Sequence, residues 1–286
     1  MVFIFQNSAL TNYMKKKLIK AASELFPEHF AQLAFQQITN PQVKKLRPHE
    51  LEVLQRARQA TISYKGYRIR TYTWNEQGHG KELLLIHGWE GQAGNFADIV
   101  ERLVAKDFRV YAFDGPSHGF SSKAPTSLFE YTLMAGTIIE EYGIKNLISH
   151  SFGSVPVTYS LMTNPGLHLK KYVLLTTPDK FTERIDQVSA KVGFSESTKI
   201  KLVQLIEKET NMKIAELNVS EFIKKIRVDN ALILHDVNDK VIPISQARHV
   251  HHQWPGSIFK EVSGTGHFRI LRNDKVIDEV VRFFLH

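Results

Sequence analysis

Short apolar segments alternate with amphipathic ones along the chain after residue 60. The apolar segments have the length and flanking turn residues of buried strands and cover 82–86, 108–113, 146–150, 172–175, 231–234 and 258–262. Helical periodicity fills most of the intervals, over 95–106, 127–142, the stretch after residue 151, and 275–284. This alternation predicts an α/β protein whose mostly parallel sheet carries helices on both faces.

The first 74 residues follow other patterns. Residues 1–60 show three stretches with apolar positions at helical spacing, interrupted by Pro27 and by Asn40-Pro41, and the third begins at Pro48. Residues 61–74 are rich in Thr, Tyr and Ile around Lys65-Gly66, which predicts two strands joined by a tight turn. We therefore expect an N-terminal helical extension over 1–60 ahead of the α/β region.

A second helical region interrupts the α/β alternation at about 179–229. It contains no convincing strand, but apolar side chains recur at helical spacing, and Ser220 is positioned to cap its third helix. An insertion of about fifty residues exceeds a normal crossover. We expect a small helical lid, whose apolar stripes either line a substrate site or pack on the sheet.

Composition narrows the function classes. Hydrophobic residues make up 43% and charged residues 23% of the chain, as in ordinary globular proteins, and there is no cysteine for a disulfide or a thiolate site. The net charge of +8 is spread without a basic stripe, which argues against nucleic-acid binding. No apolar run approaches the roughly 18 residues of a membrane span. Residues 1–8 turn polar too early for a signal peptide, so we expect a cytoplasmic protein, and a homo-oligomer is compatible with the sequence.

Chemistry-bearing residues follow four of the expected strands. The turn Ser149-His150-Ser151-Phe152-Gly153 has the form of a nucleophile elbow in which a serine replaces the first glycine of G-x-S-x-G. The other three turns carry His87-Gly88-Trp89, an acidic loop with Asp236 and Asp239, and a loop with His267. Since carboxyl ends of parallel strands share one edge, these turns are expected to meet.

The chain resembles the α/β-hydrolase superfamily in these motifs. The serine, the acid and the histidine follow that family's chain order, and the run 113–121 looks like its turn after the fourth strand. The resemblance covers about 61–286 and implies the α/β-hydrolase fold, with a sheet of about eight strands. It leaves residues 1–60 outside the family's minimal core.

The resemblance also assigns roles. A serine hydroxyl needs a base to become a nucleophile, so Ser151 would attack, His267 would take its proton, and an aspartate would orient the imidazole. Residue types alone leave Asp236 and Asp239 in competition, and the family's H-D-x-x-D-x-x-x-P-like run favours Asp239. By similarity, the backbone N–H groups of Trp89 and Phe152 would form the oxyanion hole. The expected pocket residues are His87, Gly88, His150 and Thr177.

The implied activity is hydrolysis of a carboxylic ester of a small or medium acyl substrate, through an acyl-enzyme and without metal or cofactor. Thioester hydrolysis, C–C bond hydrolysis and acyl transfer use the same residues and stay open. So does a non-catalytic binding protein on this scaffold. Two other interpretations compete: Ser151 as a helix N-cap, and a dinucleotide fingerprint over Gly88–Gly94 with Asp114 as its acid.

Overall fold

The computed structural model describes residues 9–210 and 212–286, so the inference from residues 1–8 lies outside the described residues. The chain forms two compact units. The sheet unit consists of segments 40–179 and 218–286, and the helical unit combines the first two helices with segment 180–217. These boundaries differ from the expected division into 1–60 and 61–286, because the units follow contacts between distant segments.

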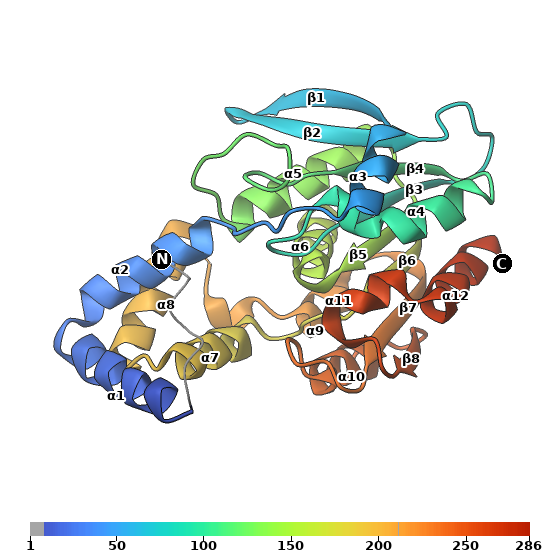
Figure 1. The fold of residues 1–286 in the computed structure, drawn as a ribbon. Helices are drawn as coiled ribbons and strands as arrows, with labels where there is room; N and C mark the ends of the chain where they lie inside the picture. Colours follow the sequence, from blue (N-terminus) through green and yellow to red (C-terminus); the bar gives the residue numbers. More distant parts are fainter. Residues whose placement is uncertain (1–8, 211) are drawn as a thin grey trace. The chain divides into compact units, whose positions relative to one another are not determined.

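An eight-stranded sheet forms the centre of the sheet unit, in the order β1-β2-β4-β3-β5-β6-β7-β8 (Figure 1). In chain order the strands are β1 (Arg58–Tyr64), β2 (Tyr67–Trp74), β3 (Glu82–Ile86), β4 (Arg109–Phe113), β5 (Asn146–His150), β6 (Leu169–Leu175), β7 (Val228–Asp236) and β8 (Ile258–Val262). Antiparallel pairs join β1 to β2 and β2 to β4, and all other neighbours are parallel. The expected mostly parallel sheet is confirmed.

The hairpin between β1 and β2 follows from its two turn residues. Lys65 and Gly66 have φ angles of 44° and 84°, the left-handed pair of a two-residue hairpin turn. Tyr64 consequently pairs with Tyr67 across the turn, and the register continues to Arg58 opposite Thr73.

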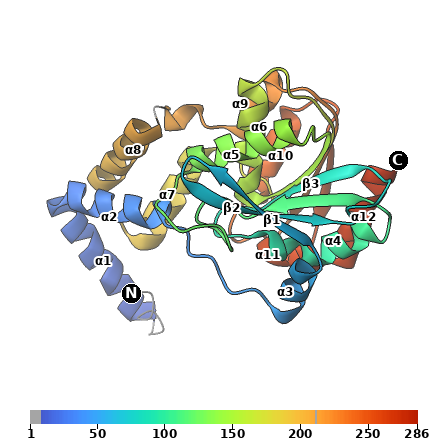
Figure 2. The same ribbon diagram turned by 90° about the horizontal axis from the view of Figure 1, so that it is seen from above.

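Helices cover both faces of the sheet (Figure 2). On one face α4 (Ala97–Val104) packs with α12 (Asp274–Leu285), and α3 (Pro48–Gln55) contacts α4. On the other face α5 (Leu128–Glu141) packs with α6 (Ser154–Thr163), and α9 (Val219–Phe222) contacts both α6 and α10 (Ile244–His252). Connections by helices of this kind are what parallel strands require.

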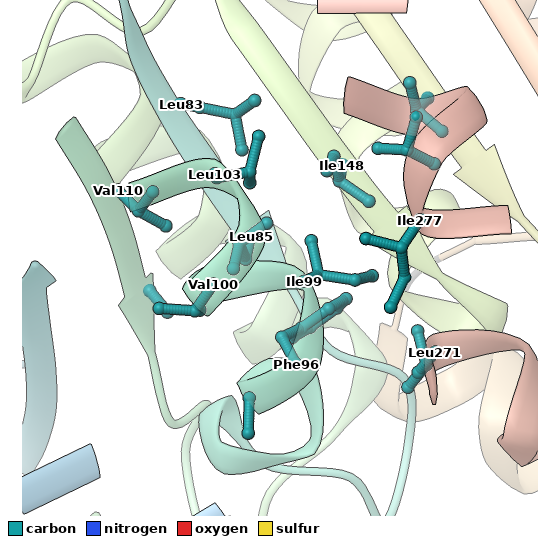
Figure 3. Packing of buried hydrophobic residues seen from close by; sticks show 14 of the residues in the cluster. Leu83, Leu85, Phe96, Ile99, Val100, Leu103, Val110, Ile148, Leu271 and Ile277 are labelled. Carbon is teal, nitrogen blue, oxygen red and sulfur yellow. The ribbon is translucent and has the colours of Figure 1, made fainter. Parts of the chain in front are cut away.

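The core beside α4 shows why the strands are almost continuously apolar. Leu83 and Leu85 of β3 lie with Ile99 of α4 and Ile277 of α12 in one fully buried cluster (Figure 3). Leu84, between them in sequence, is equally buried on the opposite face. Each such side chain contributes about 1.5–3 kcal/mol by leaving water. Burial on both faces thus accounts for the pattern from which the strands were predicted.

The helical unit joins two segments that lie far apart in sequence. Its helices are α1 (Ala9–Leu25), α2 (Pro27–Thr39), α7 (Phe181–Val192) and α8 (Glu196–Thr210). Ala31 and Ala34 of α2 pack with Ile185 of α7 and with Leu202 of α8. The Ser23 hydroxyl also accepts a 2.9 Å hydrogen bond from a backbone N–H of the insertion. The N-terminal helices therefore fold together with the insertion.

Two helical segments belong to the sheet unit instead. Helix α3 is tied to β2, because the Trp74 indole donates a 2.8 Å hydrogen bond to the Val53 carbonyl. Ser220 lies inside α9 rather than at its N-cap, which is Asn218. Its backbone N–H donates to the buried Asp179 carboxylate at 2.8 Å. The expectation that Ser220 caps a helix is therefore wrong, since an aspartate from the other side of the insertion satisfies that helix end. Among the described helices, none combines the length and apolar character needed to cross a bilayer.

Candidate active site

The carboxyl ends of β5, β7 and β8 bring three side chains of the expected site together. Ser151 follows β5, Asp239 lies in the loop after β7, and His267 is the second residue of the short helix α11 (Gly266–Arg269) after β8. The His267 Nε2 lies 2.9 Å from the Ser151 Oγ, and the His267 Nδ1 lies 2.7 Å from the Asp239 Oδ2. All three residues are buried within the sheet unit.

The turn that carries Ser151 is sharply bent. Ser151 has a φ of 53°, in the left-handed region that non-glycine residues rarely occupy, and it starts the single 3-10 turn leading into α6. A Cβ on Gly153 would lie 2.6 Å from the His87 carbonyl oxygen, so only glycine fits there. The Ser151 hydroxyl bonds to His267 and caps no helix. The N-cap interpretation is therefore wrong, and the geometry is that of a nucleophile elbow.

Ser149, which replaces the usual first glycine of the elbow, has a specific partner. Its hydroxyl lies 2.7 Å from the Tyr172 hydroxyl of the neighbouring strand β6, and both side chains are fully buried. Each buried hydroxyl is thus satisfied by the other, which removes the desolvation cost of an unpaired polar group. The serine is accommodated by a tyrosine that offers it a hydrogen bond.

Asp239 reaches the imidazole and is held as a carboxylate. Its Oδ1 accepts hydrogen bonds from the backbone N–H groups of Val241 and Ile242 at 2.7 and 3.0 Å. Burial works to raise the pKa of Asp239, but the hydrogen bond and charge of His267 and these two N–H groups lower it below its ordinary value. The acceptor beside His267 is therefore ionised at neutral pH.

Asp236, the competing acid, holds the histidine loop. Its Oδ2 accepts hydrogen bonds from the backbone N–H of Thr265 at 2.6 Å, from the Thr265 hydroxyl at 2.8 Å and from the Gly266 N–H at 2.8 Å. Burial opposes ionisation, but these donors and the Asn238 N–H lower the pKa of Asp236. Asp236 thus fixes the residues directly before His267, while Asp239 contacts its ring.

The turn after β3 lies against the elbow. A Cβ on Gly88 would lie 3.0 Å from the Ser151 Cβ and 3.4 Å from the Phe152 backbone nitrogen. The turn is closed by a 3.0 Å hydrogen bond from the Gly91 N–H to the Gly88 carbonyl. The segment 87–91 therefore runs beside Ser151 and Phe152, as an oxyanion-binding turn would.

Two neutral imidazoles hold this turn from behind. His87 Nε2 accepts from the Gly115 N–H at 2.9 Å, and His118 Nε2 accepts from the Glu90 N–H at 3.2 Å. An imidazole that accepts at Nε2 carries its proton at Nδ1, where His87 contacts the Gly88 carbonyl and His118 the Pro116 carbonyl. Desolvation lowers the pKa of His87 to about 4 and, with the nearby His87, that of His118 to about 2.

Asp114 completes the support of this turn and cannot bind a ribose. The side chain is fully buried, and its carboxylate accepts hydrogen bonds from the Ala93 N–H, the Phe120 N–H and the Tyr72 hydroxyl. A Cβ on Gly94 would lie 2.7 Å from a Leu46 methyl carbon, so this glycine serves packing. Gly94 and Asp114 thus make contacts within the protein, and the dinucleotide-binding hypothesis is wrong.

The remaining expected pocket residues, His150 and Thr177, are buried. His150 Nε2 lies 2.9 Å from the His267 carbonyl oxygen, and burial, followed by the His267 charge, lowers the pKa of His150 to about 3. The Thr177 hydroxyl donates to the Pro178 carbonyl and lies 2.8 Å from the Ser154 hydroxyl. Trp89 and Phe152 are half-buried. Contact of these residues with a substrate stays a prediction.

Sequence reasoning missed the supporting contacts of Asp236 and His118, although both residues stand in the quoted motifs. The motifs mark both residues as candidates, but the residues that they contact follow other strands, and those contacts depend on the order of strands in the sheet. Phe268 was also missed: its ring stands edge-on at 4.8 Å from the His267 ring and is 56% exposed. Over residues 9–210 and 212–286, no three His, Asp or Glu side chains are grouped as metal ligands would be.

Comparisons of the sequence with known proteins point to the same fold. The model of the family described as "alpha/beta hydrolase fold" matches residues 82–194. A Danio rerio "Serine hydrolase-like protein" is 33% identical over 91 residues, which are 30% of this chain and 27% of that protein. A Xanthomonas campestris "Pimeloyl-[acyl-carrier protein] methyl ester esterase" is 47% identical over 51 residues, 18% of this chain and 20% of the relative. The chain thus spans about a quarter or less of the length of these two relatives.

Solved structures share the fold over most of both chains. An esterase from Exiguobacterium antarcticum superimposes with a TM-score of 0.63 at 16% identity, covering 79% of this chain and 99% of the other. An enol-lactonase from Burkholderia xenovorans gives a TM-score of 0.60 at 14% identity, covering 79% and 100%. The sheet order, the elbow and the family match agree that this chain has the α/β-hydrolase fold.

Proposed function

We propose that this protein is a serine hydrolase that cleaves a carboxylic ester of a small or medium acyl substrate. The observation that carries the proposal is the unbroken hydrogen-bonded series from the Ser151 Oγ through His267 to Asp239. In that series His267 carries its proton at Nδ1, toward the carboxylate, and presents the Nε2 lone pair to the serine hydroxyl. Attack of the Ser151 Oγ on an ester carbonyl then delivers its proton to Nε2.

The charge that develops on the imidazole is matched by Asp239. This carboxylate keeps two backbone N–H donors on Oδ1 while Oδ2 faces the His267 ring. It therefore stabilises the imidazolium without taking its proton. The imidazolium next protonates the leaving alcohol, and a water molecule releases the acyl group from Ser151 by the same route in reverse.

The oxyanion is proposed to bind between the backbone N–H groups of Trp89 and Phe152. Support comes from the close approach of the turn after β3 to Ser151 and from the helix that begins at the elbow. His87 and His118 accept backbone N–H groups and so keep the turn in place. Loss of one oxyanion donor in such enzymes costs about 3 kcal/mol of transition-state stabilisation.

Ester hydrolysis is favoured within the superfamily by the relatives' names. The Xanthomonas relative is named a methyl ester esterase, and the compared structures are an esterase and a lactonase. The sequence match covers a small part of the relative, and the solved structures share only the fold with this chain. The acyl group of the substrate therefore has to be identified by experiment. Thioesters and C–C bonded diketones are the comparison substrates, because they would use the same three residues.

Labelling with a fluorophosphonate probe tests the nucleophile directly. The purified full chain is expected to form an adduct on Ser151, located by peptide mass spectrometry, and Ser151→Ala is expected to form none. Esters of increasing acyl length, each paired with its thioester, then define the substrate class by kcat/KM.

The control is Ser63→Ala, which removes an exposed serine hydroxyl from β1 and should leave labelling unchanged. An adduct on another serine, or no adduct while intact protein is shown by its melting transition, would contradict the proposal. The scaffold would then be assigned to binding rather than catalysis.

A further inference from the structure

A basic cavity lies at the edge of the sheet opposite the candidate active site. It has a volume of about 260 Å³, and its lining includes Lys81, Lys145, Lys170 and Lys171. All four belong to the sheet unit. No step of the proposed ester hydrolysis uses them.

The topology explains why lysines from three distant segments meet here. Lys81 stands directly before β3, Lys145 directly before β5, and Lys170 and Lys171 lie at the start of β6. Because β3, β5 and β6 are neighbouring parallel strands, their amino ends share one edge. The Lys145 carbonyl accepts the Lys170 backbone N–H at 2.7 Å, which fixes the two segments against each other.

The positive charges of this cavity are not matched by acids. Among the residues that the structure describes, Glu82 is the one carboxylate in the lining, and its Oε1 already accepts from Arg109 at 2.9 Å and from Tyr111 at 3.1 Å. Lys81 and Lys171 donate to the Phe284 and Phe283 carbonyls at the end of α12, at 2.8 and 2.7 Å. These carbonyls end a helix and carry part of its negative dipole charge, so the hydrogen bonds orient the two ammonium groups and offset their charge only in part.

Lys145 and Lys170 are exposed, and within the described residues their ammonium groups have neither an ion pair nor a hydrogen bond. Desolvation, and then the charge of Lys81, lower the pKa of Lys171, as expected where like charges crowd a half-buried site. The cavity therefore brings four lysine ammonium groups together, two of them held by the end of α12 and two able to turn toward an anion.

We propose that this cavity binds a diphosphate group. A phosphate monoester carries about −1.5 to −2 charges at pH 7, so one such group would balance only about half of the lysine charge. Lysine ammonium groups are strongly hydrated point charges that suit phosphate oxygens. A diphosphate adds a second phosphate group and so comes closer to balancing four lysines that stand at three strand ends.

Calorimetric titration of the full chain with inorganic pyrophosphate at constant ionic strength tests the proposal. Saturable binding at one site is expected, and Lys145→Gln/Lys170→Gln should weaken it by about tenfold or more through the loss of two nearby charges. The matched control is Lys106→Gln/Lys225→Gln, two exposed lysines elsewhere on the sheet unit, which should stay within about twofold. Both double variants lower the net charge equally.

Absence of saturable binding to the wild-type chain overturns the proposal. An equal loss in the two double variants also overturns it, because the attraction would then arise from net charge alone. Amine acetylation with mass spectrometry gives a second readout: pyrophosphate should protect Lys145 and Lys170 but not Lys106. Ester turnover should be the same in both variants, so failure here is distinguishable from failure of the proposed hydrolase activity.

Discussion

The two edges of the parallel sheet differ in how their charged side chains are partnered. At the carboxyl edge, every acid near the site is met by donors: Asp236 by four hydrogen bonds and Asp239 by two backbone N–H groups and His267. At the amino edge, the four cavity lysines share a lining whose one carboxylate is already paired with Arg109. Over residues 9–210 and 212–286, the two aspartates of the carboxyl edge have their hydrogen-bond donors, whereas the lysines of the amino edge outnumber the carboxylates beside them.

This difference shows where each edge can be altered without harm. Buried, fully bonded groups lose stability or geometry when one partner is removed, because the remaining partners stay desolvated. Neutralising an exposed lysine that has no counter-charge changes the stability of the protein little, and salt screens the electrostatic effect of the change. The largest effects of substitution are therefore expected at the carboxyl edge and the smallest at the amino edge.

The largest effect is expected from Ser151→Ala. Ester turnover should fall by about 10⁴-fold or more, because the hydroxyl is the proposed nucleophile, while the free energy of unfolding changes by less than about 1 kcal/mol. Steady-state kinetics and urea denaturation check the two parts. Persistent turnover with collapsed stability would show that the hydroxyl serves structure.

Substitution of the two aspartates should affect different properties, turnover for Asp239 and stability for Asp236. Asp239→Asn is expected to lower kcat by about 10³–10⁴-fold with little loss of stability, since the imidazole loses its ionised partner. Asp236→Asn should destabilise the fold by about 2–4 kcal/mol, because one amide cannot accept all the hydrogen bonds that the carboxylate accepts. Its kcat should fall less.

Urea denaturation and kinetics on both variants at equal folded fraction make this comparison. A larger drop in kcat for Asp236→Asn than for Asp239→Asn would move the acid role to Asp236.

Stability should decline with acid below about pH 6.5. The folded state keeps His87 and His118 neutral down to about pH 4 and about pH 2, while unfolded histidine takes a proton near 6.5. The unfolded state therefore binds more protons as pH falls, and each such imidazole removes about 1.4 kcal/mol per pH unit below 6.5. Denaturation with urea at pH 7, 6 and 5 measures the slope.

His118→Gln sharpens this test, because the amide oxygen can replace Nε2 as acceptor for the Glu90 N–H. The slope should fall by about 1.4 kcal/mol per pH unit relative to wild type. Burial raises the pKa of Asp114, which acts in the opposite direction, but it is present in both proteins and drops out of the difference. The exposed His252→Gln should leave the slope unchanged.

The smallest effect is expected at the amino edge. Lys145→Gln/Lys170→Gln should keep ester turnover within about twofold and raise the melting temperature slightly at low ionic strength, since like charges repel less. The rise should vanish in about 1 M salt, where the Debye length is about 3 Å. A loss of stability at low salt would mean that the lysines have partners in solution.

Local patterns were sufficient for most of the fold. The strands 82–86, 146–150 and 258–262 coincide with β3, β5 and β8, because buried parallel strands are apolar on both faces and end at turn residues. The turn at Lys65-Gly66 and the helix starting at Pro48 were equally readable. The strand alternation and the motif order indicated the α/β-hydrolase fold, which the structure and the family match confirm.

Contacts between distant segments were not readable. The sequence left open what α1 and α2 pack against, and the structure places them with α7 and α8. An amphipathic pattern predicts that a helix face is buried, but it does not identify the segment that covers the face. Likewise, only the structure shows that the serine at position 149 has a hydrogen-bond partner, the Tyr172 hydroxyl on the adjacent strand.

The sequence by itself determined which residues stand at strand ends, and therefore which side chains are candidates for chemistry at Ser151, Asp239 and His267. Only the tertiary structure decided that Asp239 rather than Asp236 contacts the imidazole, that Asp114 is consumed internally, and that four lysines share one cavity. The physical reason is that strand order sets these neighbours. Periodicity along a chain reports burial, whereas strand order depends on how the whole sheet assembles.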